Sequence, residues 1–371
     1  MKDRHTSVEE QNAVVDELLS ALAERDARIA ELERASAELQ SAQKAVHLAA
    51  KVTLASLRVH ALLLLRPKLG VLRQYAPRPI RLPRKHLVTG PPQVVTGPPQ
   101  ASLKISVVTP SLNQAAYLER TMRSVIEQNY SSLEYIVQDG GSRDGSAEII
   151  RKYASSLTRW ESAKDTGQAQ AINRGFQHIS GEIMAYLNSD DFFLPGTLAY
   201  VAEYFSRYPD VDAVYGHRIV VDEQDREVGR WVLPPHDDEV LSWVDYLPQE
   251  SFFWRRSIWE RAGGRMDESF QFAIDWDLIL RFRDAGAKFV RLPRFLAAFR
   301  VHSQQKTSAQ MEDVGLREVD RLRRRCHGRA VSHVEAMNAA APYLFRHILC
   351  DRLMRLRGMV DTLVHRSSRV C

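Results

Sequence analysis

Hydrophobic residues in the N-terminal part of the chain recur with the spacing of a helix. Between residues 8 and 50 the sequence has no Gly or Pro, and its apolar residues follow two interleaved seven-residue tracks. The tracks consist of Val15, Leu22 and Ile29, and of Leu18, Leu32, Leu39 and Val46, with Arg25 interrupting the second. Spacings of three and four put both tracks on one seam, which predicts a dimerising coiled coil over residues 8–50. The interruption at Arg25 leaves a single amphipathic helix as the alternative.

The helical pattern ends where prolines and glycines begin. Pro67 and Gly70 break it, and residues 88–93 are then repeated almost unchanged as residues 95–100, each copy carrying a Gly-Pro-Pro-Gln sequence. Paired prolines hold the backbone extended and remove amide donors, so this stretch is typical of a semi-rigid linker. We therefore expect a helical segment over residues 1–60, a basic Pro-rich linker over 61–102, and a domain boundary near residue 102.

Beyond the linker, short apolar runs alternate with amphipathic segments. Strands are predicted at residues 105–109, 134–138 and 183–187, and helices at 117–128, 147–153 and 197–208. This alternation predicts an α/β fold with a parallel sheet buried on both faces. In such sheets ligands bind beyond the carboxyl ends of the strands, so these ends are the places to look for chemistry.

The first two predicted strands end in polar residues. Thr109, Pro110 and Asn113 follow the first strand, and the stretch from Asp139 to Ser146 follows the second. Asp139 can accept hydrogen bonds from a base or a ribose, and the glycines after it allow a close approach to a ligand. The alternative is an acidic turn before a helix. A calcium loop is excluded, because the alternation of oxygen ligands is lost at Gly141 and Arg143 and no closing glutamate follows.

Two adjacent carboxylates follow the third strand. Asp190 and Asp191 come directly after Asn188 and Ser189. Neighbouring carboxylates repel each other unless a cation offsets their charge, which suits a divalent ion that also holds phosphate oxygens. The alternative is that they cap the helix predicted at 197–208.

A further carboxylate pair lies near residue 276. Asp277 is expected at the N-terminus of a helix that ends around Arg283, where it can act as a cap or dipole partner. Asp275 lies just before it among apolar residues, where a carboxyl group held at a cleft has a raised proton affinity. Alone, such an Asp is more often structural than catalytic. The case for a catalytic role of Asp275 therefore comes from its combination with the other motifs.

In this order the motifs resemble family 2 glycosyltransferases, whose catalytic domain has the GT-A fold. The resemblance covers residues 103–306, and its pieces are Thr109–Asn113, Asp139–Ser146, Asp165–Gly175, Asn188–Asp191, Gln249–Arg255, Asp275–Asp277 and Phe299–His302. Two departures limit it. Many relatives have Asp where this chain has Gln170, and the Gln-X-X-Arg-Trp element of processive synthases is missing, so transfer of a single sugar per binding event is expected.

The resemblance implies a role for each matching residue. The expected donor-nucleotide ligands are Thr109, Pro110, Asn113, Asp139, Asp165 and Asp190. Asp191 and His302 are expected at a Mg²⁺ or Mn²⁺ ion, Gln249 and Glu250 at the sugar or acceptor, and Asp275 matches the general base. A UDP-sugar donor is favoured by the family alone.

These residue types suit sugar transfer on chemical grounds. Departure of a nucleoside diphosphate builds negative charge that a divalent cation stabilises, and the incoming hydroxyl needs one carboxylate to accept its proton. Direct displacement with a single base implies inversion at the anomeric carbon. We expect a glycan or lipid-linked acceptor in bacterial surface polysaccharide or glycolipid synthesis. The alternatives are a nucleotidyltransferase, or a scaffold protein with a degenerate glycosyltransferase domain.

Composition adds information about location. The 371 residues carry a net charge of +5, and residues 51–104 contain no Asp or Glu. The longest aliphatic run, residues 61–65, is too short to span a bilayer, and the polar N-terminus predicts cytoplasmic residence. Residues 307–371 are expected to form a helical extension in which Phe345, Leu349 and Leu353 alternate with arginines. This pattern predicts either contact with the inner face of the plasma membrane or a helix packed on the catalytic domain. Nucleic acid is not expected as a partner.

Overall fold

The computed structural model describes residues 28, 31, 75–81, 103–303, 305 and 314–367, with side chains to residue 354. The chain separates into two compact units, Met1–His60 and Ala61–Cys371. In the first unit Arg28 and Glu31 are helical, exposed and joined by an ion pair of 2.7 Å. Apart from these two residues, the predicted coiled coil at 8–50 lies outside the described residues, as does the repeat at 88–100.

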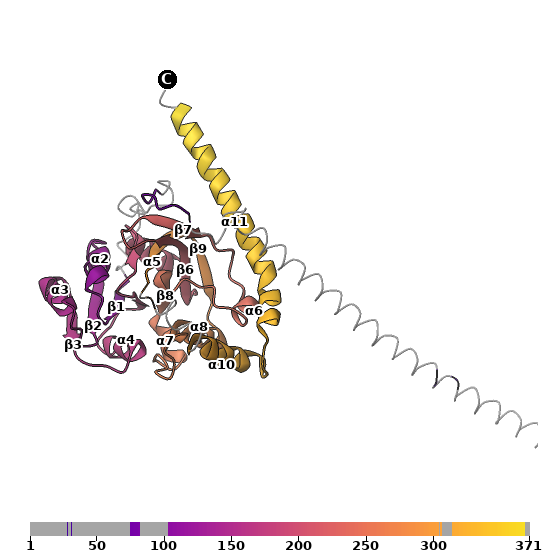
Figure 1. The fold of residues 1–371 in the computed structure, drawn as a ribbon, viewed down its shortest axis with the longest axis horizontal. Coiled ribbons are helices and arrows are strands. Elements are labelled where there is room, and N and C mark those ends of the chain that lie inside the picture. Colours follow the sequence, from indigo (N-terminus) through magenta and orange to yellow (C-terminus); the bar gives the residue numbers. More distant parts are fainter. Residues whose placement is uncertain are drawn as a thin grey trace, which may run out of the picture. The chain divides into compact units, whose positions relative to one another are not determined.

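A single mixed sheet forms the centre of the second unit (Figure 1). Its strands are β1 (Ile105–Ser111), β2 (Leu133–Asp139), β3 (Arg159–Ser162), β4 (Ile183–Tyr186), β5 (Phe192–Phe193), β6 (Ala213–Val221), β7 (Glu227–Trp231), β8 (Phe252–Arg255) and β9 (Phe289–Arg300). They follow the order β3-β2-β1-β4-β8-β6-β9-β5, and β7 pairs with β6. The prediction of an α/β fold is confirmed.

The first half of this sheet is parallel, as the sequence predicts. β1 pairs in parallel with both β2 and β4, and Ser111 is in register with Asp139, so these strands end at one edge. Side chains alternate along β1: Ile105 and Val107 pack in one core cluster, and Val108 packs in the cluster on the other face. Burial on both faces explains why these strands are continuous apolar runs.

Helices cover both faces of the sheet. They are α2 (Ala115–Ile126), α3 (Ser146–Lys152), α4 (Gln168–Phe176), α5 (Thr197–Arg207), α6 (Asp238–Leu241), α7 (Arg256–Arg261), α8 (Ile274–Asp284), α10 (Leu316–His327) and α11 (His333–Ser367), with short 3-10 turns η2 (Ala154–Ser156) and η3 (Gln249–Ser251). Apolar residues of α2, α3 and α5 pack on one face of the sheet. Those of α4, α7, α8 and α10 pack on the other. The helices predicted at 117–128, 147–153 and 197–208 are therefore explained by apolar stripes that one sheet face buries.

The second half of the sheet departs from the parallel arrangement. β8 runs antiparallel to β4 and β6, and β9 pairs in parallel with β6 and antiparallel with β5. The long strand β9 thus returns to the segment that follows β4. Its last residue, Arg300, donates its backbone N–H to Asp191 Oδ1 at 3.0 Å. Because β9 is parallel to β6, and thus to β4, its carboxyl end lies at the same edge of the sheet as the motif after β4.

Part of the predicted linker packs on this body. Arg78 forms an isolated antiparallel bridge with Glu227 of β7, and its guanidinium lies 2.6 Å from the Glu227 carboxylate. Glu227 is fully buried and also accepts hydrogen bonds from Arg230 and Tyr75. A buried carboxylate requires such partners, so residues 75–81 contribute to the environment of β7.

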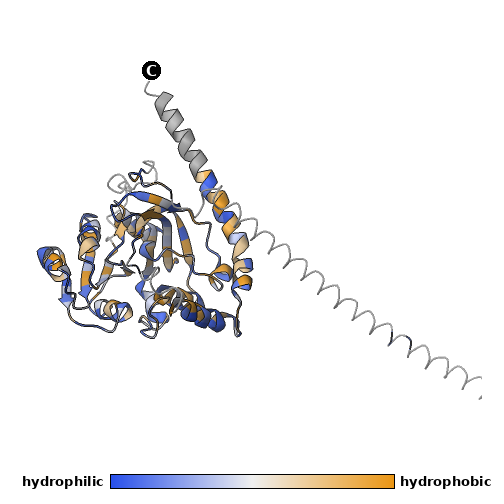
Figure 2. Cartoon of the chain, viewed as in Figure 1, coloured by the Kyte–Doolittle hydropathy of each residue, from blue (hydrophilic) through white to orange (hydrophobic). Residues whose placement is uncertain are grey.

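The predicted C-terminal helical extension is present, with α11 as its longest helix. One face of α11 packs on the body through Tyr343, His347 and Asp351, all buried. The opposite face exposes Phe345 (63%), Leu349 (52%) and Leu353 (45%), and Figure 2 shows such hydrophobic positions between hydrophilic ones. The helix therefore packs on the domain and also presents an apolar stripe. None of the described helices combines the length and apolar character needed to cross a membrane.

Candidate active site

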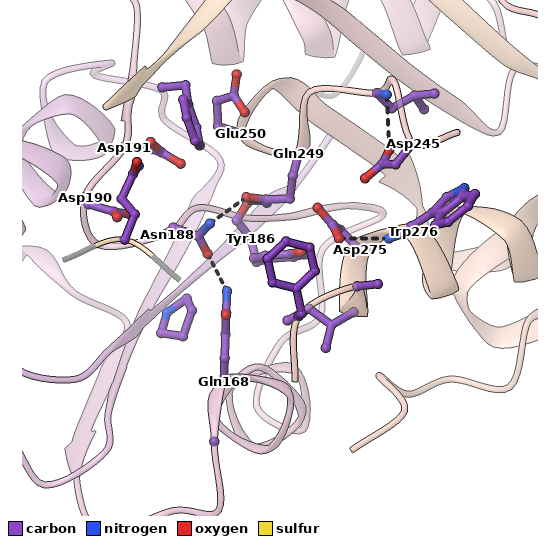
Figure 3. Close-up of a pocket in the computed structure, with 18 of the residues that line it drawn as sticks. Gln168, Tyr186, Asn188, Asp190, Asp191, Asp245, Gln249, Glu250, Asp275 and Trp276 are labelled. Carbon is purple, nitrogen blue, oxygen red and sulfur yellow. Dashed lines mark hydrogen bonds between the residues drawn. The ribbon is translucent and has the colours of Figure 1, made fainter. Parts of the chain in front are cut away.

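A cavity of about 720 Å³ opens at the carboxyl ends of β1 and β4. Most of its lining residues lie at the end of β1, around the end of β4, in the segment before β8, before and within the first turn of α8, at the start of α4 and on one face of α10. Strands β6, β7 and β9 add Arg218, Trp231 and Phe299. Figure 3 shows Asp190 and Asp191 toward one end and Asp245, Asp275 and Trp276 toward the other. The cavity thus lies where α/β sheets generally bind ligands.

The two carboxylates after β4 are held by the end of β9. Asp191 is buried, and its Oδ1 accepts the Arg300 amide at 3.0 Å; Asp190 Oδ2 lies 3.0 Å from His302 Nε2. Burial raises the pKa of Asp191 well above its usual range, and repulsion from Asp190 and Glu250 adds to the shift. Helix α5 is preceded by Gly196 in the left-handed conformation, with no side-chain cap, so the alternative role of this pair as a helix cap is wrong.

At the other end of the cavity, Asp275 lies within the first turn of α8. The helix begins at Ile274, earlier than the sequence suggests, and Asp275 Oδ1 accepts the Trp276 amide of its own helix at 2.9 Å. Burial raises the pKa of Asp275 above the usual range, although Arg218 and nearby amides oppose the shift. A carboxyl group with this property suits a general base that works near neutral pH.

Asp245 faces Asp275 across this end of the cavity (Figure 3). Water reaches its side chain from the cavity, yet protein surrounds it, and its Oδ1 accepts the Leu247 amide at 3.3 Å. Desolvation by the protein around the cavity, with repulsion from Asp275 added to it, raises the pKa of Asp245, although its side chain is exposed to solvent. Sequence reasoning missed this residue because it belongs to no recognised motif and follows the apolar Val244.

Amide side chains connect the two acidic ends. Gln168 at the start of α4 donates to Asn188 Oδ1 at 2.7 Å, and Asn188 donates to Gln249 Oε1 at 3.1 Å. Gln249 in turn donates to the Tyr186 carbonyl at 2.8 Å. Two of the dashed lines in Figure 3 mark the side-chain contacts of Asn188 with Gln168 and Gln249. Because each amide is held by its neighbour, the hydrogen bonds themselves fix the row of side chains that lies between the two groups of carboxylates.

Glu250 carries the buried ion pair of the cavity. Arg218 of β6 binds it through two parallel hydrogen bonds of 2.7 Å, and Glu250 is only 1% exposed. The Arg218 guanidinium also lies over the Phe299 ring at 4.4 Å from its centroid. The bidentate geometry is the strong form of an Arg–carboxylate contact. Sequence reasoning missed Arg218. Its position as the single Arg in the mostly apolar strand β6 was the available signal.

The structure gathers some predicted site residues and separates others. Those lining the main cavity are Pro110, Asp165, Asp190, Asp191, Gln249, Glu250 and Asp275. Thr109, Asn113, Asp139 and His302 are not among its lining residues; Asn113 and His302 instead line a smaller neighbouring cavity. Asp139 is fully buried and accepts hydrogen bonds from the amides of Gly141 and Ser142 and from the Ser162 hydroxyl. Its carboxylate thus organises the turn after β2.

The carboxylates of Asp190 and Asp191 suit a divalent cation whose other ligands are water and phosphate oxygens. Within the described part of the chain, no group of three or more His, Cys, Asp or Glu side chains converges to hold a metal without help. Asp190 and Asp191 supply adjacent hard oxygens at the cavity, and Asp190 is already contacted by His302. Mg²⁺ commonly binds to one or two carboxylates and completes its shell with water and substrate phosphates, which is the arrangement these residues permit.

Comparisons with known proteins agree with this architecture. Residues 106–267 match the family described as glycosyl transferase family 2. An uncharacterized glycosyltransferase of Mycobacterium tuberculosis is 32% identical over 183 residues, which cover 48% of this chain and 68% of that protein. A PGL/p-HBAD biosynthesis glycosyltransferase of Mycobacterium bovis is 29% identical over 185 residues, which cover 49% and 70%.

Among solved structures, S. aureus TarS 1-349 in complex with UDP-GlcNAc aligns with a TM-score of 0.51 and 19% sequence identity. The alignment covers 66% of this chain and 72% of that one. At this identity the likeness concerns the fold, which is that of the GT-A enzymes.

The Arg218–Glu250 pair gives a stability prediction. Arg218→Met leaves Glu250 buried and unpaired near Asp191, so the free energy of unfolding should fall by about 3–5 kcal/mol. Chemical denaturation measures this change. Adding Glu250→Gln removes the uncompensated charge, so the double variant should be more stable than Arg218→Met. A double variant that is equally unstable would contradict charge pairing as the cause.

Proposed function

The chain belongs to glycosyltransferase family 2, and from this premise we propose that it is an inverting enzyme that moves one sugar from a nucleotide-sugar donor to a hydroxyl acceptor. The observation that carries the proposal is the arrangement of carboxylates in one cavity. Asp190 and Asp191 lie toward one end and Asp275 toward the other, with the ordered Gln249 and Asn188 amides between them. The donor phosphates and the attacking hydroxyl would thus occupy different ends.

The donor end has residues suited to a nucleoside diphosphate. Pro110, in β1, and Asp165 line the same cavity and would contact the nucleotide, and Asp190 and Asp191 would hold a divalent cation. When bound, Mg²⁺ or Mn²⁺ supplies Lewis-acid stabilisation of the charge on the departing β-phosphate. Asn113 and Asp139 would act on the nucleotide indirectly, through the turns that they shape, and Thr109 through β1, where its hydroxyl contacts that of Tyr135.

Asp275 would act as the base. In the proposed step the acceptor oxygen bonds to the anomeric carbon as the bond to the diphosphate oxygen breaks, and the hydroxyl proton passes to an Asp275 carboxylate oxygen. Attack from the face opposite the leaving group inverts the anomeric centre, and no covalent sugar intermediate is needed. Glu250 would keep Arg218 in place at the cavity wall, and Gln249 would offer its amide to the sugar.

A glycan or lipid-linked acceptor is proposed on two grounds. One relative is named for PGL/p-HBAD biosynthesis, and the acceptor end of this cavity includes the apolar side chains of Val244, Phe272 and Val319. Apolar lining near the base suits an acceptor that has an apolar part next to its hydroxyl.

Donor binding can be tested by thermal stabilisation with UDP-, GDP-, dTDP- and CMP-sugars, with and without Mn²⁺ or Mg²⁺. We expect one nucleotide class to raise the melting temperature only when metal is present; at 100 times Kd, binding adds about 2.7 kcal/mol of stability. Asp191→Asn should abolish the metal-dependent part, whereas Asp210→Asn, on the exposed surface, should retain it. An equal shift without metal would argue against the cation. Released nucleoside diphosphate supports sugar transfer; released pyrophosphate would indicate a nucleotidyltransferase.

The base assignment predicts the effect of Asp275→Asn. This variant should lower kcat by roughly 10²- to 10⁴-fold while the Kd of the donor is unchanged. In the unmodified enzyme, kcat should fall as pH drops through the Asp275 pKa, because the protonated acid cannot accept a proton. Since that pKa is raised, the acid limb should lie above the usual Asp value of about 3.9. Asp284→Asn, at the exposed end of α8, is the matched control. Full turnover by Asp275→Asn would remove the assigned base.

Membrane contact through α11 is also part of the proposal. The exposed apolar stripe Phe345, Leu349 and Leu353 supports shallow insertion into a membrane surface, where a lipid-linked acceptor would be available. In flotation with anionic liposomes at low salt, replacing all three residues by Ser should reduce the bound fraction several-fold. Tyr208→Ser, at an exposed aromatic residue elsewhere, should leave it unchanged. No flotation of the unmodified protein would rule out this contact.

A further inference from the structure

Helix α10 lies beyond residues 106–267, which match the family, yet it forms part of the cavity wall. Leu316, Val319 and Arg323 all line the cavity that contains Asp275. Their spacing of three and four residues places them on one face of the helix. Figure 1 shows α10 beside α8, the helix whose first turn carries Asp275.

A second feature of α10 concerns the segment that leads into α8. Glu318 is 8% exposed, and its carboxylate accepts three backbone hydrogen bonds from residues 271–273. Oε1 accepts the Gln271 amide at 2.8 Å, and Oε2 accepts the amides of Phe272 at 2.8 Å and Ala273 at 2.9 Å. Charge-assisted bonds of this length are about twice as strong as neutral ones. One side chain therefore fixes three successive peptide units.

These three peptide units set where α8 begins. Ala273 is the residue before the helix and has no side-chain hydrogen bond that caps it. Asp275 follows two residues later, and its carboxylate accepts a hydrogen bond from the amide of the next residue in its own helix. The position of that carboxylate in the cavity thus follows the position of the backbone that Glu318 holds.

A further contact joins the same two helices. Asp277 is fully buried in the first turn of α8, and it binds Arg325 of α10 as well as Arg281 of its own helix. Helix α10 therefore contacts the start of α8 twice. Glu318 binds the loop before the helix, and Arg325 binds Asp277 in its first turn. Two contacts of opposite charge restrain both translation and rotation of this turn.

We propose that Glu318 is a positioning residue for the transfer reaction, because it holds the loop 271–273 so that Asp275 faces the acceptor hydroxyl. The proposal rests on the proposed function, in which Asp275 is the base. A displacement of about 1 Å in a reacting group can cost on the order of 100-fold in rate. Loss of the Glu318 contacts should therefore reduce turnover without reducing donor affinity.

The test compares Glu318→Gln with Asp320→Asn in the full-length chain. Both variants replace a carboxylate of α10 by an amide, but Asp320 is exposed and has only a distant contact, 3.8 Å, with Arg323. Glu318→Gln should lower kcat by about 10- to 100-fold, leave the donor Kd within two-fold, and speed hydrogen exchange of the amides at 271–273. Asp320→Asn should change none of these. A Glu318→Gln protein with normal kcat and normal exchange overturns the proposal.

A double variant separates positioning from a general loss of structure. If Glu318 acts through Asp275, adding Glu318→Gln to Asp275→Asn should lower the residual rate by less than two-fold. Equal factors in both backgrounds would refute the positioning role. If Asp275→Asn alone keeps its activity, it is the proposed base that fails. Should Glu318→Gln not fold, Glu318→Asp, which keeps the charge but has a shorter reach, takes its place in both comparisons, and normal turnover by it overturns the proposal.

Discussion

Repulsion among carboxylates around one cavity is the constraint on which the rest of the site depends. Asp190, Asp191, Asp245, Glu250 and Asp275 all line this cavity. Desolvation by the protein, with their mutual repulsion added to it, raises the pKa of Asp191 and Asp245, while Arg218 neutralises Glu250. A cavity with this excess of acid binds a cation or a proton more readily than it binds a bare anion. In the proposed function, the same charge that would repel a diphosphate alone would favour a diphosphate that arrives with a divalent metal.

The mixed sheet explains how these acids come together. The parallel strands β1, β2 and β4 bring their carboxyl ends to one edge, and the antiparallel strand β8 starts there, directly after Gln249 and Glu250. Strand β9 then returns to the same edge and fixes Asp191 through the Arg300 amide. A fully parallel sheet would put the start of β8 at the opposite edge. The change of strand direction is therefore what adds the second set of polar residues to the site.

Sequence patterns predicted local features better than long-range contacts. The strands beginning at Ile105 and Ile183 follow the apolar runs, because burial on both faces dictates such runs. Motif order also pointed to Asp190, Asp191 and Asp275, and all three line the cavity. Asp139 was predicted to contact the ligand, but the amides and hydroxyls of its own turn surround its carboxylate. No pattern in the sequence indicates which polar groups a carboxylate will bind, because the folded turn decides which of them lie within hydrogen-bond distance.

Glu318 shows why a family match does not define the limits of the working enzyme. It lies 45 residues beyond Ala273 in sequence, and the Arg325–Asp277 contact spans 48 residues. A boundary at residue 306 would leave three backbone amides and one buried carboxylate at the start of α8 without these partners. Each unpartnered buried polar group costs about 1–3 kcal/mol, more if it is charged. The carboxylate proposed as the base lies between these groups in sequence, so the helical extension belongs physically to the catalytic domain.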